Sequence, residues 1–314
     1  MRSVDIHAHY YPEEFLHLLG SEGKTFGASY TRQETTFSFS TPAGGLGPLP
    51  LKFIDVQALS LSVPMVYWAD RQLNARLARA WNDAASMVHR QHPQRFVVLA
   101  TLPMLEADDA IAELERAAEL PGVRGVYMGT NINGLDLDNP RFAPVFARIE
   151  QLGLPVFLHP QQTVGGNRLS NYYLSNLLGN PFDTAIAASH LILGGVLDQY
   201  PQLHVSLPHA GGALPILVGR LDAGWTSRPE TRRLAQKPSS YLTRFSYDTV
   251  SHSGPVLDYL IANVGIDHLV LGSGYCFDMG YEQPVRFVES VGLGPREKAA
   301  VLGANAARIL KLPV

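Results

Sequence analysis

Short apolar runs alternate along the chain with longer segments in which apolar residues recur at helical spacing. Eight of these runs have the length and composition of buried strands, at residues 4–6, 56–63, 96–102, 123–128, 155–158, 203–207, 245–247 and 269–271. Helices are predicted between them, at residues 70–92, 107–120, 140–152, 182–193, 212–221, 255–264, 282–291 and 305–310. Repeated strand–helix units predict an α/β protein, most simply one (β/α)8 TIM barrel over residues 1–314. A doubly wound open sheet shares this local pattern.

Two stretches interrupt the alternation. Residues 20–50 are rich in glycine, proline, threonine and aromatic residues, and Thr35, Phe37 and Phe39 alternate as in a short strand. We interpret this stretch as a flap inserted after the first strand and lying over the barrel mouth, because exposed phenylalanines are unfavourable; a loose surface loop is the alternative. Residues 160–181 follow the fifth strand and have the length of a loop that shapes an active site.

Composition narrows the class of protein. With 46% hydrophobic residues and a net charge of -3, the chain is globular and lacks the basic surface that nucleic acid requires. Only 17% of residues are charged, which favours a large core or a subunit interface, so we expect a homodimer or higher homo-oligomer. The single cysteine fits a reducing compartment, and no apolar run has the length of a membrane span or signal peptide. We therefore expect a cytoplasmic protein with no membrane partner.

Histidines stand at the predicted ends of several strands. His7 and His9 are two residues apart at the end of the first strand, so their side chains project to the same side. His159 ends the fifth strand and His209 follows the sixth. Because all strands of a barrel end at one mouth, the four side chains would meet there, although each alone is more often a packed or surface residue. Together they predict a divalent metal site, with Zn2+ favoured and Mn2+ as the alternative, next to an acid/base group.

The chain resembles the amidohydrolase superfamily, in the branch that contains aminocarboxymuconate semialdehyde decarboxylase and related aromatic acid decarboxylases. The resemblance covers nearly the whole chain and is carried by the segments DIHAHYYP, FLHPQ, HVSLPHAGGALP, YDTVSH, LGSGY and GANAARIL. It implies a divalent ion, usually zinc, held by His7, His9 and His159 and by an aspartate at the end of the eighth strand. It also implies that His209 activates the metal-bound water or protonates the substrate carbon.

Two further candidates follow the seventh strand. Asp248 ends that strand, where its carboxylate could orient His209 or a metal ligand, or cap the following turn. His252 lies in the next loop and resembles a residue near the substrate in some relatives; a solvent-exposed loop histidine is the alternative.

Other candidate residues would contact the substrate. Tyr67 after the second strand and Asn131 after the fourth would line the pocket with an aromatic wall and an amide donor. Arg168 or Arg32 could bind the substrate carboxylate, although arginines in loops are usually only solvated.

Two features depart from the family pattern. Residues 51–55 leave too little chain before the second strand for the helix that relatives carry there, so the first barrel helix is expected to be truncated. Neighbouring strands would then be exposed unless the flap, another subunit or a rearranged segment covers them. In the eighth-strand segment, Gly274 stands where relatives carry the acidic ligand. Asp278 or Cys276 could replace it, or the metal could be held by three histidines, bound weakly, or absent.

These observations favour a metal-dependent decarboxylase of a small unsaturated or aromatic carboxylic acid, with His209 and Asp248 as catalytic residues. A metal-dependent hydrolase or hydratase of an aromatic-degradation intermediate is the alternative enzyme. A catalytically impaired paralogue, kept for ligand binding or for pairing with an active subunit, is the alternative from another class.

Overall fold

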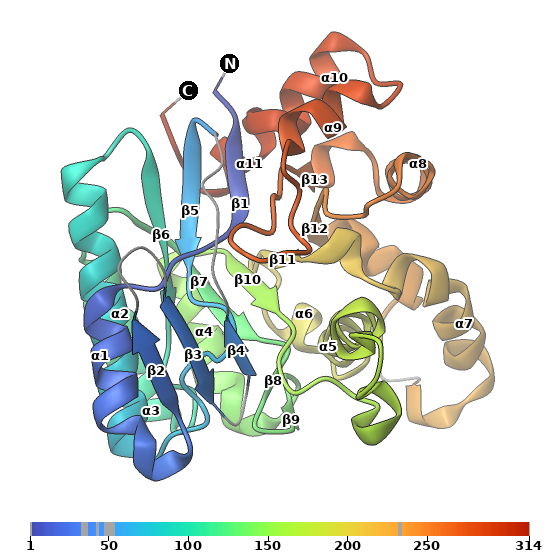
Figure 1. Ribbon diagram of the computed structural model, residues 1–314. Coiled ribbons are helices and arrows are strands. Elements are labelled where there is room, and N and C mark those ends of the chain that lie inside the picture. Colours follow the sequence, from blue (N-terminus) through green and yellow to red (C-terminus); the bar gives the residue numbers. More distant parts are fainter. Residues whose placement is uncertain (1, 33–36, 42–43, 47–53, 232–233, 314) are drawn as a thin grey trace.

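The computed structural model describes residues 2–32, 37–41, 44–46, 54–231 and 234–313 (Figure 1). Within these residues the main sheet has eight strands, and each pairs in parallel with the strand that precedes it in the sheet. In sheet order, which is also chain order, they are β1 (Val4–His9), β5 (Val56–Ser60), β6 (Phe96–Thr101), β7 (Val123–Gly129), β10 (Val156–His159), β11 (Val205–Leu207), β12 (Phe245–Asp248) and β13 (Leu269–Val270).

Backbone hydrogen bonds close this sheet into a barrel. The amide of Ile6 donates to the carbonyl of Leu271 (3.0 Å), and the amide of Gly274 donates to the carbonyl of His7 (2.9 Å). These bonds join the first strand to the segment that ends the eighth. The predicted (β/α)8 barrel is therefore confirmed, and the open sheet is excluded.

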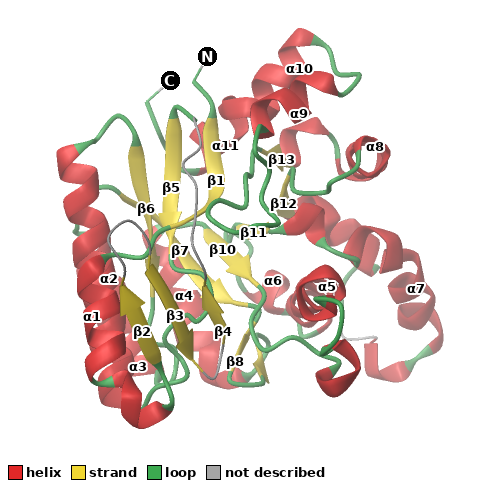
Figure 2. Cartoon of the chain, viewed as in Figure 1, coloured by secondary structure: helices red, strands yellow, loops and turns green. Residues whose placement is uncertain are grey.

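Helices surround the barrel (Figure 2). Within the described residues the α-helices are α1 (Glu13–Ser21), α2 (Arg71–Gln91), α3 (Ala107–Ala118), α4 (Ala143–Leu152), α5 (Asn180–Leu193), α6 (Val196–Gln199), α7 (Leu214–Ser227), α8 (Gly254–Val264), α9 (Pro284–Ser290), α10 (Pro295–Ala299) and α11 (Asn305–Ile309). No helix of the described chain combines the length and apolar character needed to cross a membrane.

Helix α2 shows how the local sequence produces these elements. The side chain of Asp70 accepts a hydrogen bond from the amide of Leu73 (2.8 Å), which caps the helix start. Leu77 and Trp81 recur at helical spacing and are fully buried against the core. Each such side chain contributes roughly 1.5–3 kcal/mol relative to remaining in water. The same periodicity made this helix predictable from the sequence.

The segment after β1 begins with α1, which packs against α2 and against the first strand of a small antiparallel sheet. This sheet contains β2 (Ser29–Arg32), β3 (Phe37–Thr41) and β4 (Gly44–Leu46). Residues 33–36, 42–43 and 47–53 of the predicted flap and of the shortened connection lie outside the described residues. Whether the flap closes over the mouth therefore stays a prediction.

The expected gap in the helical layer does not expose the neighbouring strands. Every residue of β1 and β5 is buried. The π-helical turn η9 (Ala300–Ala304) and α11 both pack against β1, and α11 lies beside it in Figure 1. The C-terminal segment of the same chain thus covers the outer side of the first strand.

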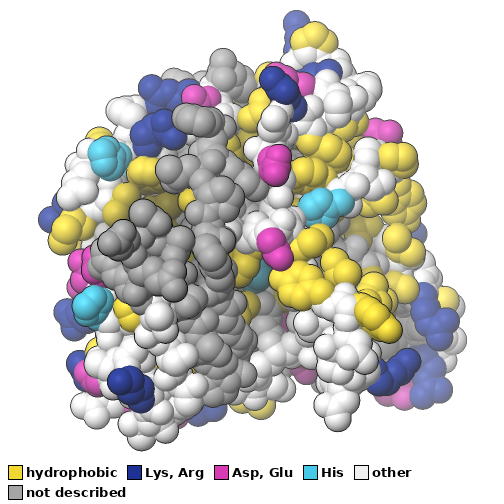
Figure 3. All heavy atoms as spheres, viewed as in Figure 1, with side chains coloured by type: hydrophobic (Ala, Val, Ile, Leu, Met, Phe, Trp, Pro, Cys, Tyr) yellow, Lys and Arg dark blue, Asp and Glu magenta, His cyan; other side chains and the backbone are white. Residues whose placement is uncertain are grey.

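Exposed hydrophobic side chains gather around one side of the barrel mouth, over the region where α5 and α8 lie (Figure 3). We call this group the apolar rim; it comprises Leu177, Leu178, Phe182, Ile216, Val256 and Tyr259. Hydrogen bonds connect its elements, because the Tyr259 hydroxyl of α8 donates to the carbonyl of Pro215, at the start of α7 (3.0 Å). The amide of Ala213 in turn donates to the carbonyl of Pro181, at the start of α5 (3.1 Å).

Candidate metal and active site

Four histidines meet inside the mouth of the barrel. His7 and His9 lie on β1, His159 is the last residue of β10, and His209 begins the short turn η5 (His209–Gly211) after β11. The ring centroid of His7 is 5.0 Å from that of His9, 5.3 Å from that of His159 and 5.2 Å from that of His209. Parallel strands that end at one mouth therefore bring together residues that are far apart in the sequence.

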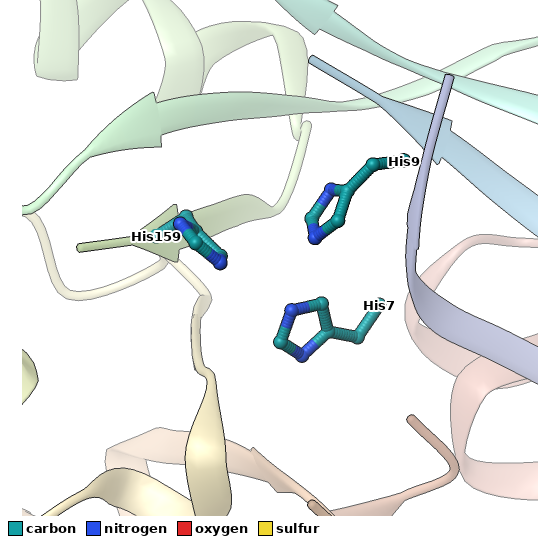
Figure 4. A group of neighbouring side chains, drawn as sticks. All are labelled: His7, His9 and His159. Carbon is teal, nitrogen blue, oxygen red and sulfur yellow. The ribbon is translucent and has the colours of Figure 1, made fainter. Parts of the chain in front are cut away.

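Three of these side chains form a group that fits a metal ion. The candidate ligand nitrogens of His7, His9 and His159 all lie within 4.8 Å of one another, and the three residues are buried. Figure 4 shows their rings turned toward one another from β1 and β10. Three imidazoles that converge in this way match the protein ligands of a site with an open coordination position.

Hydrogen bonds assign the proton of two of these rings to Nδ1. The Ser60 hydroxyl donates to the carbonyl of Ala8 (2.9 Å), so it accepts the hydrogen of His9 Nδ1 (2.9 Å). His159 Nδ1 donates to the carbonyl of Pro160 (3.0 Å). Nε2 of each ring is then left with a lone pair, and in His9 this nitrogen is buried with no hydrogen-bond partner in the described chain. Such an atom is what a metal ligand requires.

The third ring is held by Asp248. Nδ1 of His7 donates to Oδ2 of Asp248 over 2.5 Å, while Oδ1 accepts the backbone amides of Ala210 (2.8 Å) and Val250 (2.9 Å). Burial by itself raises the pKa of this carboxyl, but the bond from His7, the nearby His209 and the Ala210 amide outweigh burial and lower the pKa. The ionised carboxylate therefore orients His7 and also caps the turn, so both roles considered for it are present.

The same carboxylate holds a strained turn. His209 and Ala210 both have a φ of 54°, a left-handed conformation that is uncommon outside glycine. The hydrogen bond from the Ala210 amide to Asp248 fixes this turn, and with it the position of the His209 ring.

His9, His159 and His209 are kept neutral. Burial lowers the pKa values of His9 and His159 well below the usual value, and the neighbouring histidines lower them further. Burial, followed by the proximity of His7, lowers the pKa of His209 to about 3. Neutral imidazoles have the lone pairs that a cation needs, so the donor set fits a divalent metal ion.

The fourth ligand that the resemblance implies is not supplied by any of the candidates considered. Gly274 lies beside the cavity, but its φ is 68° and a Cβ there would lie 3.1 Å from the Cα of Gly280. Neither Asp278 nor Cys276 belongs to the group of metal-binding side chains found among the described residues. Asp278 is exposed and accepts a hydrogen bond from Tyr173, and Cys276 is buried. The candidate protein ligands among the described residues are therefore three histidines.

A cavity of about 760 Å3 opens above the histidines. His7, His159 and His209 form its floor together with Phe277, whose ring centroid is 5.2 Å from that of His9. Much of its wall comes from residues 160–181, which include η3 (Gly166–Leu169) and the π-helical turn η4 (Ser175–Gly179). Among the described residues, those that line it include no lysine, arginine, aspartate or glutamate.

Three of the predicted substrate contacts lie elsewhere. Tyr67 is fully buried, and its hydroxyl accepts the amide of Gly129 (3.4 Å). Asn131 donates to the carbonyl of Gln161 (2.6 Å), so it connects the loops after β7 and β10. Arg168 is exposed in η3 and is not part of the cavity lining. The structure corrects these expectations because loop conformation, which strand positions do not determine, decides which side chains face the cavity.

The remaining predicted residues differ in their place relative to the cavity. His252 lines the cavity, and its ring centroid is 4.7 Å from that of Tyr281. Arg32 is in β2, and its side chain lies outside the described residues. Sequence reasoning missed Ser60 and Phe277. Ser60 had one available signal, because it ends the strand that neighbours the His7 and His9 strand.

Comparison with known proteins agrees with this geometry. A 2-amino-3-carboxymuconate-6-semialdehyde decarboxylase of Dictyostelium discoideum is 35% identical over 264 residues, which cover 82% of this chain and 73% of that protein. The crystal structure of a 5-carboxyvanillate decarboxylase from Sphingomonas paucimobilis has a TM-score of 0.84 and 25% identity, and covers 99% of each chain.

A third relative adds a metal to the comparison. The structure of a dihydroxybenzoic acid decarboxylase from Polaromonas sp. JS666 was solved with bound manganese and the inhibitor 2-nitroresorcinol. It has a TM-score of 0.79 and 21% identity, covers 99% of this chain and 97% of that one, and supports the fold. The family model described as Amidohydrolase matches residues 4–312 of the chain. With this match and the histidine-lined barrel mouth, the chain belongs to the amidohydrolase family.

Proposed function

We propose that the protein is a metal-dependent carboxy-lyase that decarboxylates a small aromatic or unsaturated carboxylic acid. The observation that carries this proposal is the group of three buried histidines with a fourth, neutral histidine beside them, next to a cavity of about 760 Å3. The relatives described above are named as decarboxylases, which favours loss of CO2 over the hydrolase or hydratase alternative.

His7, His9 and His159 would hold the divalent ion. When bound, this ion supplies a Lewis acid that polarises the oxygens of the substrate near the bond that breaks. We propose Zn2+, because three imidazoles without a carboxylate are a common ligand set for it. The manganese in the Polaromonas relative makes Mn2+ the alternative.

His209 would manage the proton. In decarboxylation the bond between the carboxylate and the adjacent carbon breaks, CO2 leaves, and the electron pair that remains on the carbon must take up a proton. His209 faces the cavity and is neutral in the free site, because burial lowers its pKa to about 3. An anionic substrate beside the ring raises that pKa, so the imidazole can carry the proton that the carbon receives. Asp248 would be a positioning residue, because it orients His7 and holds the turn of His209.

The cavity lining supports a planar acid with neutral polar substituents. Thr163, Asn176 and Ser251 offer hydroxyl and amide groups, whereas Phe277 and Val256 offer apolar surface. We propose that His252 contacts the substrate at the edge of this cavity.

We also propose that the apolar rim is covered by a second copy of the chain in a homo-oligomer. Ile216 of the rim is 69% exposed, and the low fraction of charged residues is consistent with an extensive interface. Light scattering of the parent and of Ile216→Asp tests this proposal, since the variant is expected to dissociate. A monomeric parent would contradict it. A cytoplasmic location remains our proposal, supported by the single cysteine.

The experiment that tests the function combines metal analysis with turnover. The purified protein, reconstituted with Zn2+ or Mn2+, is incubated with 2,6-dihydroxybenzoate, 5-carboxyvanillate and related acids, and CO2 release is measured together with product mass. His209→Ala is expected to retain the metal and to lose about 100- to 10,000-fold in turnover. His190→Ala is the matched control, because His190 pairs with Asp138 outside the cavity. Water addition without CO2 would favour the hydratase alternative, and absence of both metal and turnover would favour an impaired paralogue.

A further inference from the structure

A second, much smaller cavity lies inside the barrel and shares His7 as a wall with the large one. Its volume is about 10 Å3, which is close to the space that one water molecule requires. Its polar wall consists of His7, Tyr127, Ser206 and Asp248, and apolar side chains complete the lining. The substrate cavity and this chamber are therefore separated by the ring of a candidate metal ligand.

Two residues that line this chamber carry buried hydroxyl groups that make no hydrogen bond within 3.5 Å in the described chain. They belong to Tyr127 on β7, which is 2% exposed, and to Ser206 on β11, which is 1% exposed. A buried hydroxyl without a partner costs about 1–3 kcal/mol, so two of them in one small cavity require an explanation. The Tyr127 ring is packed between neighbours, with its centroid 5.9 Å from that of His9 and 6.0 Å from that of His159. Ser60, which is not part of the chamber lining, also acts on this hydroxyl, so the chamber is one of two places where the hydroxyl can find a partner.

The Asp248 carboxylate has acceptor capacity left. Oδ1 receives two backbone amides, whereas Oδ2 receives one hydrogen bond, from His7. A carboxylate offers about four acceptor positions, so Oδ2 can take one more donor. Burial raises the pKa of Tyr127 well above its usual value; the nearby Ser60 lowers this pKa in part and the charge of Asp248 raises it, so the phenol retains its proton as a donor. Donors and acceptors in the chamber therefore match a molecule that both accepts and donates.

We propose that the chamber is a binding site for one water molecule that links the hydroxyls of Tyr127 and Ser206 to the Asp248 carboxylate. The water accepts a hydrogen bond from a hydroxyl and donates one to Oδ2, which completes the coordination of the carboxylate that orients His7. Tyr127 and Ser206 are then positioning residues. They act on the metal site through the water, Asp248 and His7, and this consequence rests on the proposed function.

A high-resolution crystal structure of the protein, with or without added metal, tests the water directly. We expect one density peak within hydrogen-bond distance of the Tyr127 hydroxyl, the Ser206 hydroxyl and Oδ2 of Asp248. A dry chamber overturns the proposal, and so does a peak that contacts none of the three groups. This measurement does not depend on the reaction that the protein catalyses.

Metal affinity tests the positioning role. Tyr127→Phe and Ser206→Ala are compared with the parent by titrating the apoprotein with Zn2+ against a chromophoric chelator, and each is expected to bind the ion about 3- to 10-fold more weakly. Ser206→Ala removes a single oxygen, so it remains informative if Tyr127→Phe does not fold. Matched controls are Tyr247→Phe and Ser246→Ala. Their hydroxyls have partners at Leu242 and His204, and neither residue lines the chamber.

Thermal melting of the same variants separates packing from positioning. The controls are expected to lose stability but to keep the parent's metal affinity. If the parent binds Zn2+ and the chamber variants bind it as tightly as the controls do, the positioning role is wrong. If the parent itself binds no metal, the proposed function fails, whereas the crystallographic test of the water still stands.

Discussion

Asp248→Asn changes the buried carboxylate that bonds the ring of the candidate metal ligand His7, and it does so with almost no change in volume. The amide oxygen of asparagine can still accept the backbone amides of Ala210 and Val250, so the turn that carries His209 keeps its support. The amide nitrogen, however, then faces Nδ1 of His7 at the 2.5 Å contact. Two donors cannot share this contact, so the His7 proton must move to Nε2 or the ring must turn.

Either change removes the lone pair that His7 presents to the metal. Loss of a partner that orients a ligand typically weakens metal binding by about 10- to 100-fold, which corresponds to about 1.4–2.7 kcal/mol. The site also loses a negative charge beside the three candidate ligands, which acts in the same direction. We therefore expect a loss of about 100-fold in Zn2+ affinity with only a small change in the free energy of unfolding.

The assay is a competition titration of the apoprotein with Zn2+ and a chelator of known affinity, together with urea unfolding in the absence of metal. Asp183→Asn is the matched control, because Asp183 is also a buried carboxylate but bonds Thr130 instead of a histidine. The control is expected to retain the parent's metal affinity. Undiminished Zn2+ affinity in Asp248→Asn would refute the reasoning that the carboxylate fixes the tautomer of His7.

Three further predictions concern the metal site and its surroundings. His159→Ala leaves two ligand histidines and is expected to abolish stoichiometric metal binding, as measured by elemental analysis after dialysis; retained metal would rule out His159 as a ligand. Gly274→Asp is expected to lower the melting temperature, because the positive φ and the close approach of the new Cβ to Gly280 cost about 1–3 kcal/mol of strain. The variant is not expected to bind Zn2+ more tightly, and tighter binding would show that the carboxylate reaches the ion. Burial raises the pKa of Asp183 to about 6, so its ionisation disfavours the folded state as pH rises from about 4 to about 6. Asp183→Asn should therefore gain about 1.4 kcal/mol relative to the parent between pH 5 and pH 8 in urea unfolding, and a gap that is independent of pH would contradict this expectation.

Much of the barrel could be predicted from the sequence because its strands are buried on both faces. Such strands appear as short, continuous apolar runs, and the helices between them repeat their apolar residues every three or four positions. All eight predicted strand positions coincide with strands of the barrel, and α2 and α3 begin within one residue of their predicted starts. Helix α1 was not predicted, since it lies in the segment between the first strand and the flap, where the regular alternation stops.

The meeting of the histidines also followed from local information. Alternation in β1 puts His7 and His9 on one side, and the shared direction of parallel strands brings His159 and His209 to the same mouth. Neither step needs a knowledge of loop conformation. Residues in loops could not be placed in this way. Tyr67 and Asn131 follow strands as expected, but their polar groups form hydrogen bonds with backbone atoms of Gly129 and Gln161.

The sequence by itself therefore determined the eight strand–helix repeats and predicted the convergence of four histidines, because these depend on periodicity and strand direction. Closure of the sheet into a barrel, which excludes the open sheet, was decided by the tertiary structure. Only the tertiary structure decided that Asp248 bonds His7 across 241 positions of sequence, and that the C-terminal helix covers β1. It also decided that position 274 has a positive φ and that a Cβ there would lie 3.1 Å from the Cα of Gly280. Backbone dihedral angles in loops and contacts between distant segments are set by packing against the whole fold, so no local pattern encodes them.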